Sequence, residues 1–195
     1  MFLAIFLHVG KVSAQQNVAV NVPDTNRIYR NLQDALLNPD KVHQIDLSRK
    51  RLDTIPEEIF QFTNLKVLNL SRNKLTFIPA EISALKNLVS LDLSNNDLTK
   101  LPDEIGALTK LTYLGLNRNL IDSLPPAIGK LVNLEVLELW DNELNDVPDE
   151  ISELKNLKVL ELRGILFSDE QQSRIDELVV PGAKIHMSPS CNCKY

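Results

Sequence analysis

The side chains best suited to bind a metal lie close to the C-terminus. Cys191 and Cys193 are two positions apart, and His186 precedes them by five residues. A disulfide between such close cysteines is strained, and a tetrahedral zinc site would need a fourth ligand. We therefore expect no metal site. The cysteines are expected either to remain in a tail or to form a disulfide with another molecule or with the C-terminal cap.

Catalytic chemistry is also poorly represented. A catalytic nucleophile needs a base and an orienting group, yet no serine or cysteine lies in a recognisable nucleophile elbow. The sequence contains no P-loop, no glycine-rich dinucleotide turn and no zinc-binding histidine pair. Acidic pairs such as Asp103 and Glu104 follow prolines, where carboxylates complement a helix dipole. We expect a protein that is not an enzyme, with no catalytic residues and no cofactor.

The elements that would position any site are defined by a repeat of 23 residues. Each copy begins with an L-x-L alternation, which predicts a short strand with one buried face. Apolar residues then follow at spacings of four and three, which indicate a helical turn that opens with proline. The first leucine-type residue of the six copies is Val42, Leu65, Leu88, Leu111, Leu134 and Leu157.

An asparagine follows the strand in most copies. Asparagine tolerates unusual backbone angles, so we expect it to bend the chain out of the strand, and its amide can satisfy buried backbone groups. The two terminal copies carry Lys50 and Ile165 at this position. The predicted structural asparagine ladder is Asn73, Asn96, Asn119 and Asn142.

Together these features resemble the leucine-rich repeat family over residues 42–187. Within it, the segments from Ile55 to Ile59 and from Leu101 to Ile105 are similar to the 23-residue Ras-suppressor-type and bacterial subclass. The resemblance implies an α/β repeat solenoid. We expect a curved leucine-rich repeat horseshoe with six short parallel strands on the concave face, helical turns on the convex face and helical caps at both ends.

Caps are needed because an open end of the stack would expose its apolar core. Residues 24–38 are predicted to form an amphipathic helix, with Ile28, Leu32 and Leu36 on one face. Ser168 and Gln171 have the spacing of a capping box before a second helix, and residues 183–187 can supply a last strand. The expected domains are 1–14 signal peptide, 15–41 N-terminal linker and helical cap, 42–167 six leucine-rich repeats, 168–187 C-terminal cap and 188–195 tail.

The N-terminal residues indicate export. The apolar run 2–7 and the small residues before Gln15 resemble a secretory signal peptide, although no basic residue precedes the run. Removal of residues 1–14 leaves 20 basic and 26 acidic side chains, a net charge of −6. This charge disfavours nucleic acid and anionic membranes as partners. We expect an exported bacterial protein (secreted, periplasmic or at the cell surface), monomeric and without a stable membrane span. The alternative location is cytoplasmic.

A candidate binding surface lies on the strand positions that face solvent in repeats four to six. Trp140 is the only tryptophan, and Tyr113 lies near it in the predicted register. Aromatic and arginine side chains are typical of interface hot spots. Gly115 is expected to leave a shallow notch between them. The predicted partner-binding residues are Tyr113, Arg118, Glu138, Trp140, Glu161 and Arg163.

Three functions are compatible with this surface. The resemblance favours a non-catalytic protein–protein interaction module that binds a protein or peptide on its concave face. An intracellular signalling adaptor of the Ras-suppressor type is the first alternative, and loss of residues 1–14 from the natural protein would argue against it. A glycan-binding surface protein is the second, because Tyr113 and Trp140 could stack on a sugar.

Overall fold

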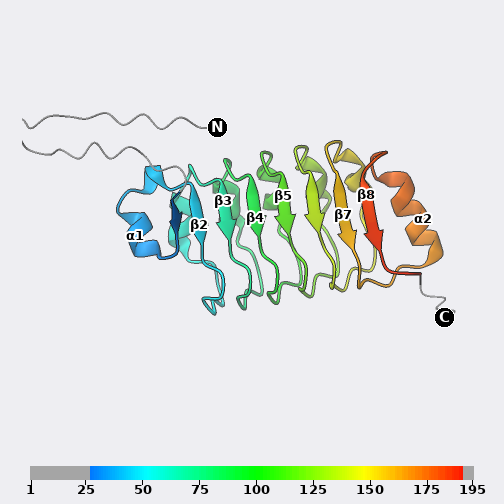
Figure 1. Ribbon diagram of the computed structural model, residues 1–195, viewed down its shortest axis with the longest axis horizontal. Helices are drawn as coiled ribbons and strands as arrows, with labels where there is room; N and C mark the ends of the chain where they lie inside the picture. The colour runs from blue at the N-terminus through cyan, green and yellow to red at the C-terminus, as the bar shows by residue number, and fades with distance from the viewer. Residues whose placement is uncertain (1–26, 191–195) are drawn as a thin grey trace, which may run out of the picture.

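The structure, a computed structural model, describes residues 27–190. The predicted signal peptide at 1–14, linker residues 15–26 and both cysteines lie outside these residues. Within them the chain forms one curved, open, eight-stranded sheet, in which every strand is parallel to its neighbours and strand order follows the chain (Figure 1). The strands are β1 (Ile28–Tyr29), β2 (Gln44–Asp46), β3 (Val67–Asn69), β4 (Ser90–Asp92), β5 (Tyr113–Gly115), β6 (Val136–Glu138), β7 (Val159–Leu162) and β8 (Lys184–Met187).

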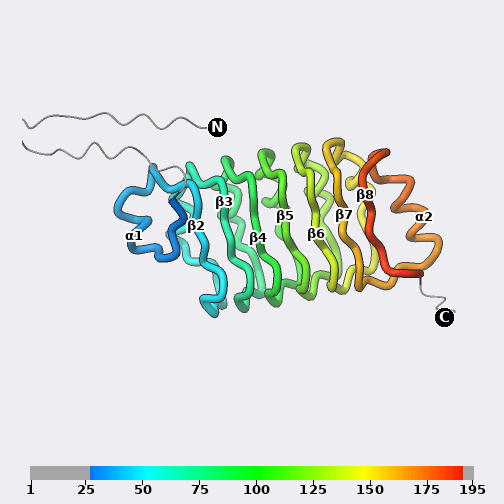
Figure 2. The backbone as a smooth tube through the Cα atoms, viewed as in Figure 1, coloured from blue at the N-terminus to red at the C-terminus, as the bar shows by residue number. Residues whose placement is uncertain are grey.

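The strands line one side of the molecule and short helices line the other, so each repeat forms one coil of a solenoid (Figure 2). The proline in each of the first five repeats precedes or opens a five-residue 3-10 helix, as the spacing predicted. The helical elements are α1 (Leu32–Leu36), η1 (Pro39–Lys41), η2 (Glu57–Gln61), η3 (Ala80–Ala84), η4 (Asp103–Ala107), η5 (Pro126–Lys130), η6 (Asp149–Glu153) and α2 (Asp169–Leu178). The predicted repeat solenoid is confirmed.

The core consists of leucine-type side chains stacked from coil to coil. Leu91, Leu114 and Leu137 occupy the centres of three adjacent strands, and none of them is exposed. No single coil could bury these side chains alone, because each one packs against the coils on both sides. Among the six repeat strands, the constant register places each residue beside the one 23 positions later, as in the pairing of Ser90 with Tyr113.

The strand count differs from the six that the repeats predicted. The additional strands are β1 and β8, and each pairs with an end of the repeat sheet. An unpaired sheet edge presents free backbone donors and acceptors, so these strands protect it. The segment predicted as a last strand, 183–187, supplies β8. The strand β1 was not expected.

The N-terminal cap also differs from the predicted helix over 24–38. Its described part contains β1 and the short helix α1, which begins after Asn31 because the Asn31 side chain accepts a hydrogen bond of 3.0 Å from the Gln33 backbone. Tyr29 is buried on the repeats, whereas Leu37 is 77% exposed. The apolar residues that suggested a single helix therefore belong to two elements: Ile28 to β1, and Leu32 and Leu36 to α1.

At the other end the capping box is confirmed. The Ser168 hydroxyl accepts a hydrogen bond of 3.2 Å from the Gln171 backbone, and Gln171 Oε1 accepts one of 3.0 Å from the Ser168 backbone. The helix that follows, α2, contacts η6 of the fifth repeat. Among residues 27–190, no helix is both long enough and apolar enough to cross a bilayer.

Four asparagines connect neighbouring coils through buried hydrogen bonds. Asn119 donates to the carbonyls of Leu93 and Leu116 at 3.1 and 2.8 Å and accepts a bond of 3.1 Å from the Leu98 N–H. The same arrangement is found at Asn73, Asn96 and Asn142.

The left-handed backbone conformation lies one position before the asparagine at which the chain was expected to bend. Residues at this position lie two or three positions after the end of a strand. Asparagine, aspartate and glycine adopt positive φ most readily, yet arginine occupies half of these positions. The φ values are 58° at Arg49, 58° at Arg72, 55° at Asn95, 56° at Arg118, 62° at Asp141 and 79° at Gly164.

Candidate functional site

Three neighbouring strands, β5, β6 and β7, bring the predicted partner-binding residues together. Their register aligns Gly115 with Glu138 and Glu138 with Glu161. Because side chains alternate along a strand, these positions lie on the face opposite the buried leucines. We call Tyr113, Arg118, Glu138, Trp140, Glu161 and Arg163 the Trp140 surface.

Tyr113 and Glu138 form one pair on this surface. The Tyr113 hydroxyl donates a hydrogen bond of 3.0 Å to Glu138 Oε2. Burial, together with the nearby carboxylates of Glu138 and Asp92, raises the pKa of Tyr113 above its usual range. The neutral phenol is therefore the stable form, and it acts as a donor.

The shallow notch expected at Gly115 is absent. A Cβ on this residue would lie 2.7 Å from the Tyr113 hydroxyl and 3.1 Å from Asp92 Oδ1. Gly115 is buried because the phenol ring leans over it. The glycine therefore accommodates the tyrosine and leaves no space for a ligand.

Glu161 connects the last repeat to the C-terminal cap. It is only 9% exposed, and it interacts with Arg163 Nε at 2.9 Å and with His186 Nδ1 at 2.8 Å. Sequence reasoning considered His186 as a metal ligand and did not assign it to this surface. The sequence did predict a last strand over 183–187, and in the structure this strand, β8, pairs His186 with Glu161.

The half-buried Trp140 and the exposed Arg118 form the aromatic part of the Trp140 surface. The Arg118 guanidinium lies 4.7 Å from the centroid of the Trp140 ring, a cation–π distance. Arg118 also pairs with Asp141 at 3.6 Å. An open hollow of about 310 Å³ lies beside the indole, and its lining consists of Trp140, Asp141, Arg163 and Gly164. This hollow can accept a small side chain of a partner.

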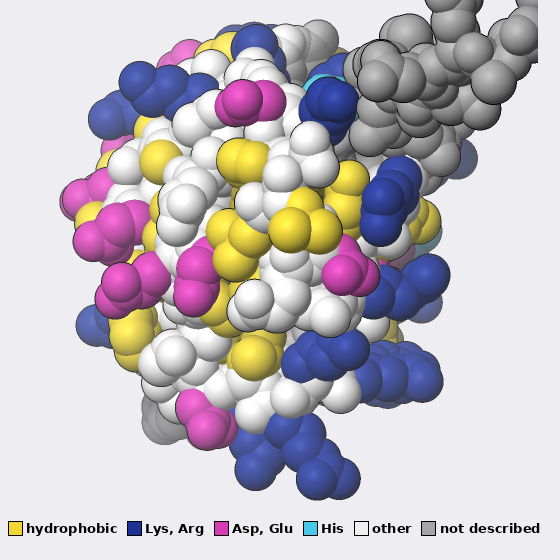
Figure 3. Space-filling view, turned by 90° about the vertical axis from the view of Figure 1, so that its left-hand side faces the viewer, with side chains coloured by type: hydrophobic (Ala, Val, Ile, Leu, Met, Phe, Trp, Pro, Cys, Tyr) yellow, Lys and Arg dark blue, Asp and Glu magenta, His cyan; other side chains and the backbone are white. Residues whose placement is uncertain are grey.

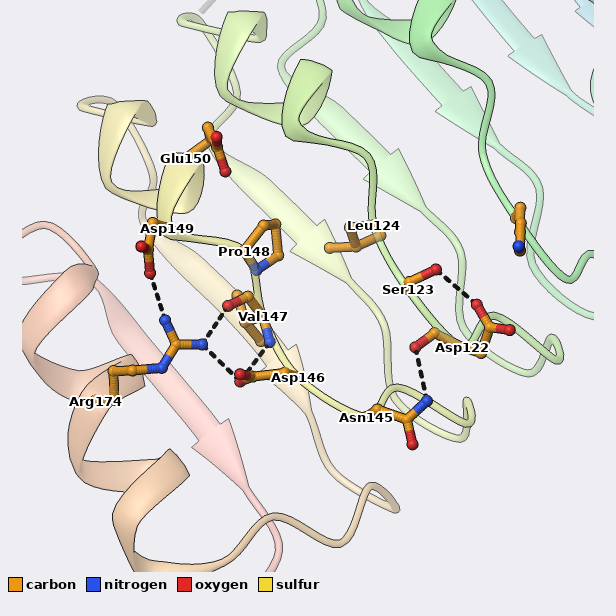
Figure 4. Close-up of a pocket in the computed structure, with 11 residues that line it drawn as sticks. Asp122, Ser123, Leu124, Asn145, Asp146, Val147, Pro148, Asp149, Glu150 and Arg174 are labelled. Carbon is orange, nitrogen blue, oxygen red and sulfur yellow. Dashed lines mark hydrogen bonds and ion pairs between the residues drawn. The ribbon is translucent and has the colours of Figure 1, made fainter.

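A larger hollow, of about 700 Å³, lies between the loops of repeats four and five and helix α2 (Figure 4). Figure 4 shows Arg174 directed from α2 toward Asp146, Val147 and Asp149. Its guanidinium pairs with Asp146 at 2.6 Å and also bonds Asp149 and the Val147 carbonyl. The hydrogen bond to Asp146 raises the pKa of Arg174. These donors are engaged within the protein, and we assign them to attachment of the cap.

Over residues 27–190, no three His, Cys, Asp or Glu side chains are placed to hold a metal ion. Cys191 and Cys193 lie outside these residues.

Comparison with known protein families supports the assignment of leucine-rich repeats. A family model described as "Leucine rich repeat" matches residues 40–98, and one described as "Leucine-rich repeat region" matches residues 103–178. Together the two matches cover more than two thirds of the chain. No curated protein sequence matches significantly.

One solved structure similar to this chain is a leucine-rich repeat protein of Leptospira interrogans. The two are 30% identical, with a TM-score of 0.49. The match covers 82% of this chain and 57% of the Leptospira protein, so this chain spans little more than half of its length.

Proposed function

The chain belongs to the leucine-rich repeat family, and from that premise we propose that it is a non-catalytic module that binds a protein or peptide through the Trp140 surface on its concave face. Leucine-rich repeat domains generally mediate protein–protein interactions. The observation that carries the proposal is the half-buried Trp140, stacked by Arg118 and adjacent to a hollow that Arg163 also lines. Tryptophan and arginine dominate interface hot spots because they bury much area and offer directional contacts.

Preorganisation supports the same role. Arg118 is held by Trp140 and Asp141, and Arg163 is held by Glu161. Long arginine side chains lose rotamer entropy when a partner immobilises them. Contacts that restrict these arginines before binding reduce that loss. A partner with a carboxylate for Arg163 and a small apolar group for the hollow fits this surface.

A glycan is the second candidate, because the indole of Trp140 lies among carboxylates that can hydrogen-bond a sugar. Arg118 stacks on the Trp140 ring and competes with a sugar for that surface. In addition, the Tyr113 hydroxyl is already bonded to Glu138. Binding to a glycan array that requires Trp140 would favour this candidate over a protein partner.

The proposal is tested by affinity capture from the native source with the full chain. The Tyr113→Ala/Trp140→Ala double variant should lose a partner that the wild type retains. The matched control is Ser48→Ala/Val67→Ala, which changes the corresponding columns of the first two repeats. Circular dichroism establishes that each variant folds. Equal capture by the double variant and the wild type would overturn the assignment of the Trp140 surface.

Export is the other part of the proposal. It is supported by the apolar run 2–7 and the small residues that precede Gln15. N-terminal sequencing of the natural protein should begin at Gln15. A mature protein that retains residues 1–14 would instead favour the intracellular adaptor.

A further inference from the structure

Two phenylalanines, Phe60 and Phe77, interrupt the repeat on the side of the solenoid that carries the 3-10 helices. Phe77 lies two residues before a repeat proline, where the other copies have Thr54, Lys100, Ser123 and Asp146. Phe60 lies four residues after such a proline, where the others have Ser83, Gly106, Gly129 and Ser152. The leucine core therefore does not require an aromatic side chain at either position.

Both side chains line one hollow between the first two repeats, of about 610 Å³. Phe77 is 52% exposed. Ile55 is buried in the same hollow, and Phe60 packs partly against the core. The hollow therefore has an apolar lining that water covers in the free protein. The remaining lining residues are Thr54, Pro56, Glu57, Pro79 and Glu81.

Carboxylates surround this apolar lining. Glu57 and Glu81 line the hollow, and the exposed Glu58 is next to Glu57 in η2. None of the three forms an ion pair with any residue in 27–190. Figure 3 views the N-terminal end of the solenoid, where acidic side chains gather on the left, the side of the 3-10 helices, and basic side chains gather along the strand side on the right. The hollow therefore combines an apolar lining with carboxylates that no ion pair within residues 27–190 neutralises.

We infer that the Phe60–Phe77 hollow is a second binding site, which takes a basic segment of a partner polypeptide. Arginine satisfies both features: its aliphatic stem covers apolar surface, and its guanidinium stacks on aromatic rings while it bonds a carboxylate. Glu57 and Glu81 are the carboxylates in reach of such a head group. An acidic segment or an anionic membrane would be repelled. The site lies on the first two repeats and shares no lining residue with the hollow of the Trp140 surface, so both can be occupied together.

The test is fluorescence anisotropy with the full chain and a labelled short peptide of alternating arginine and alanine. The wild type should bind this peptide and not its glutamate–alanine counterpart. Phe77→Thr introduces the residue type of Thr54, at an exposed position where folding is retained. This variant and Glu57→Gln/Glu81→Gln should each weaken binding by about tenfold or more, as expected when a contact of about 1.4 kcal/mol is lost.

The matched control is Asp103→Asn/Glu104→Gln, which removes two carboxylates from the first turn of η4, a repeat without either phenylalanine. The control should bind like the wild type, and so should Tyr113→Ala/Trp140→Ala, which separates this site from the Trp140 surface. Absence of wild-type binding, normal binding by Phe77→Thr, or an equal loss in the η4 control would overturn the inference. Self-association of the chain that Phe77→Thr abolishes would replace the peptide by a second copy and would also overturn it.

Discussion

The hydroxyl of Tyr113 donates a hydrogen bond of 3.0 Å to Glu138, and it does so from the space that a side chain on Gly115 would occupy. The same strand thus supplies both the donor and the residue that makes room for it. Tyr113 is two positions before Gly115, and successive residues of one face of a strand are neighbours. Gly115, which was expected to leave a notch for a ligand, instead provides the space that the Tyr113 ring occupies.

Gly115→Ala should therefore alter the Trp140 surface without unfolding the solenoid. The new Cβ would lie 2.7 Å from the tyrosine hydroxyl, so the ring must move and its bond to Glu138 is lost. Loss of one such hydrogen bond costs about 1 kcal/mol of unfolding free energy. Chemical denaturation measures this cost, and a peptide or protein partner should bind more weakly. In a Tyr113→Ala background the same substitution should cost much less; an undiminished cost would contradict the proposed contact.

The raised pKa of Tyr113 predicts a loss of stability at alkaline pH. Burial and two carboxylates favour the neutral phenol in the folded state, whereas an unfolded tyrosine ionises near pH 10. Below that pH, Tyr113 makes its full contribution to the free energy of unfolding. As pH rises toward the higher pKa of the folded state, this contribution is lost, because the unfolded state releases its proton first. Denaturation measured between pH 8 and about 11 should show this decline.

Tyr113→Phe is the control for that decline, because it keeps the ring and removes the ionisable group. Its unfolding free energy should depend less on alkaline pH than that of the wild type. In the folded wild type, phenolate absorbance should also reveal a tyrosine that resists ionisation and that Tyr113→Phe removes. Titration of all three tyrosines near pH 10 in the folded protein would refute the prediction.

Much of the fold follows from the sequence because the period of the repeat gives the register between neighbouring strands. With a period of 23 residues, one strand assignment fixes all six repeat strands, and the pairing of Ser90 with Tyr113 follows by counting. The caps have no such redundancy. Ile28, Leu32 and Leu36 fit a helical spacing, yet Ile28 belongs to β1 because the sheet edge needs a pairing strand.

The candidate site was predictable to a smaller extent. Columns of strand positions identified Trp140, Tyr113 and the charged residues around them, since register alone decides which residues are neighbours. The direction of each side chain was not predictable. The lean of Tyr113 over Gly115 and the stacking of Arg118 on Trp140 depend on rotamers that no spacing encodes.

Removal of a central ladder asparagine should be among the most damaging polar substitutions. In Asn119→Ala the Leu98 N–H would lose its side-chain partner and remain buried, whereas the Leu93 and Leu116 carbonyls still accept bonds from Asn96 and Asn142. One unsatisfied buried donor costs about 1–3 kcal/mol. Urea denaturation should show this loss.

The control for the ladder is Asn145→Ala, because Asn145 is exposed and its side chain makes one long bond of 3.4 Å to the Asp122 carbonyl. Its unfolding free energy should change by less than about 0.5 kcal/mol. If the two variants were equally stable, the buried amide would not be a principal connection between coils.

Arg174 should govern how firmly the C-terminal cap is attached. It spans from α2 to Asp146, Val147 and Asp149, three groups that its planar fork can reach together (Figure 4). Arg174→Ala should lower the unfolding free energy by roughly 1 kcal/mol, the scale of a well-placed ion pair near the surface. Arg174→Lys should recover only part of this loss, because an ammonium cannot make the same forked contacts.

Hydrogen exchange distinguishes a local effect on the cap from a global one. In Arg174→Ala the amides of β8 and α2 should exchange faster, while those of β3 and β4 stay protected, because a solenoid opens first at its ends. High salt should reduce the difference between wild type and variant, since the carboxylate partners are exposed. The matched control is Lys155→Ala, which removes an exposed cation of the fifth repeat whose side chain bonds the Ser152 carbonyl within its own coil. Uniformly faster exchange along the whole sheet, or unchanged exchange in β8, would show that Arg174 does not hold the cap.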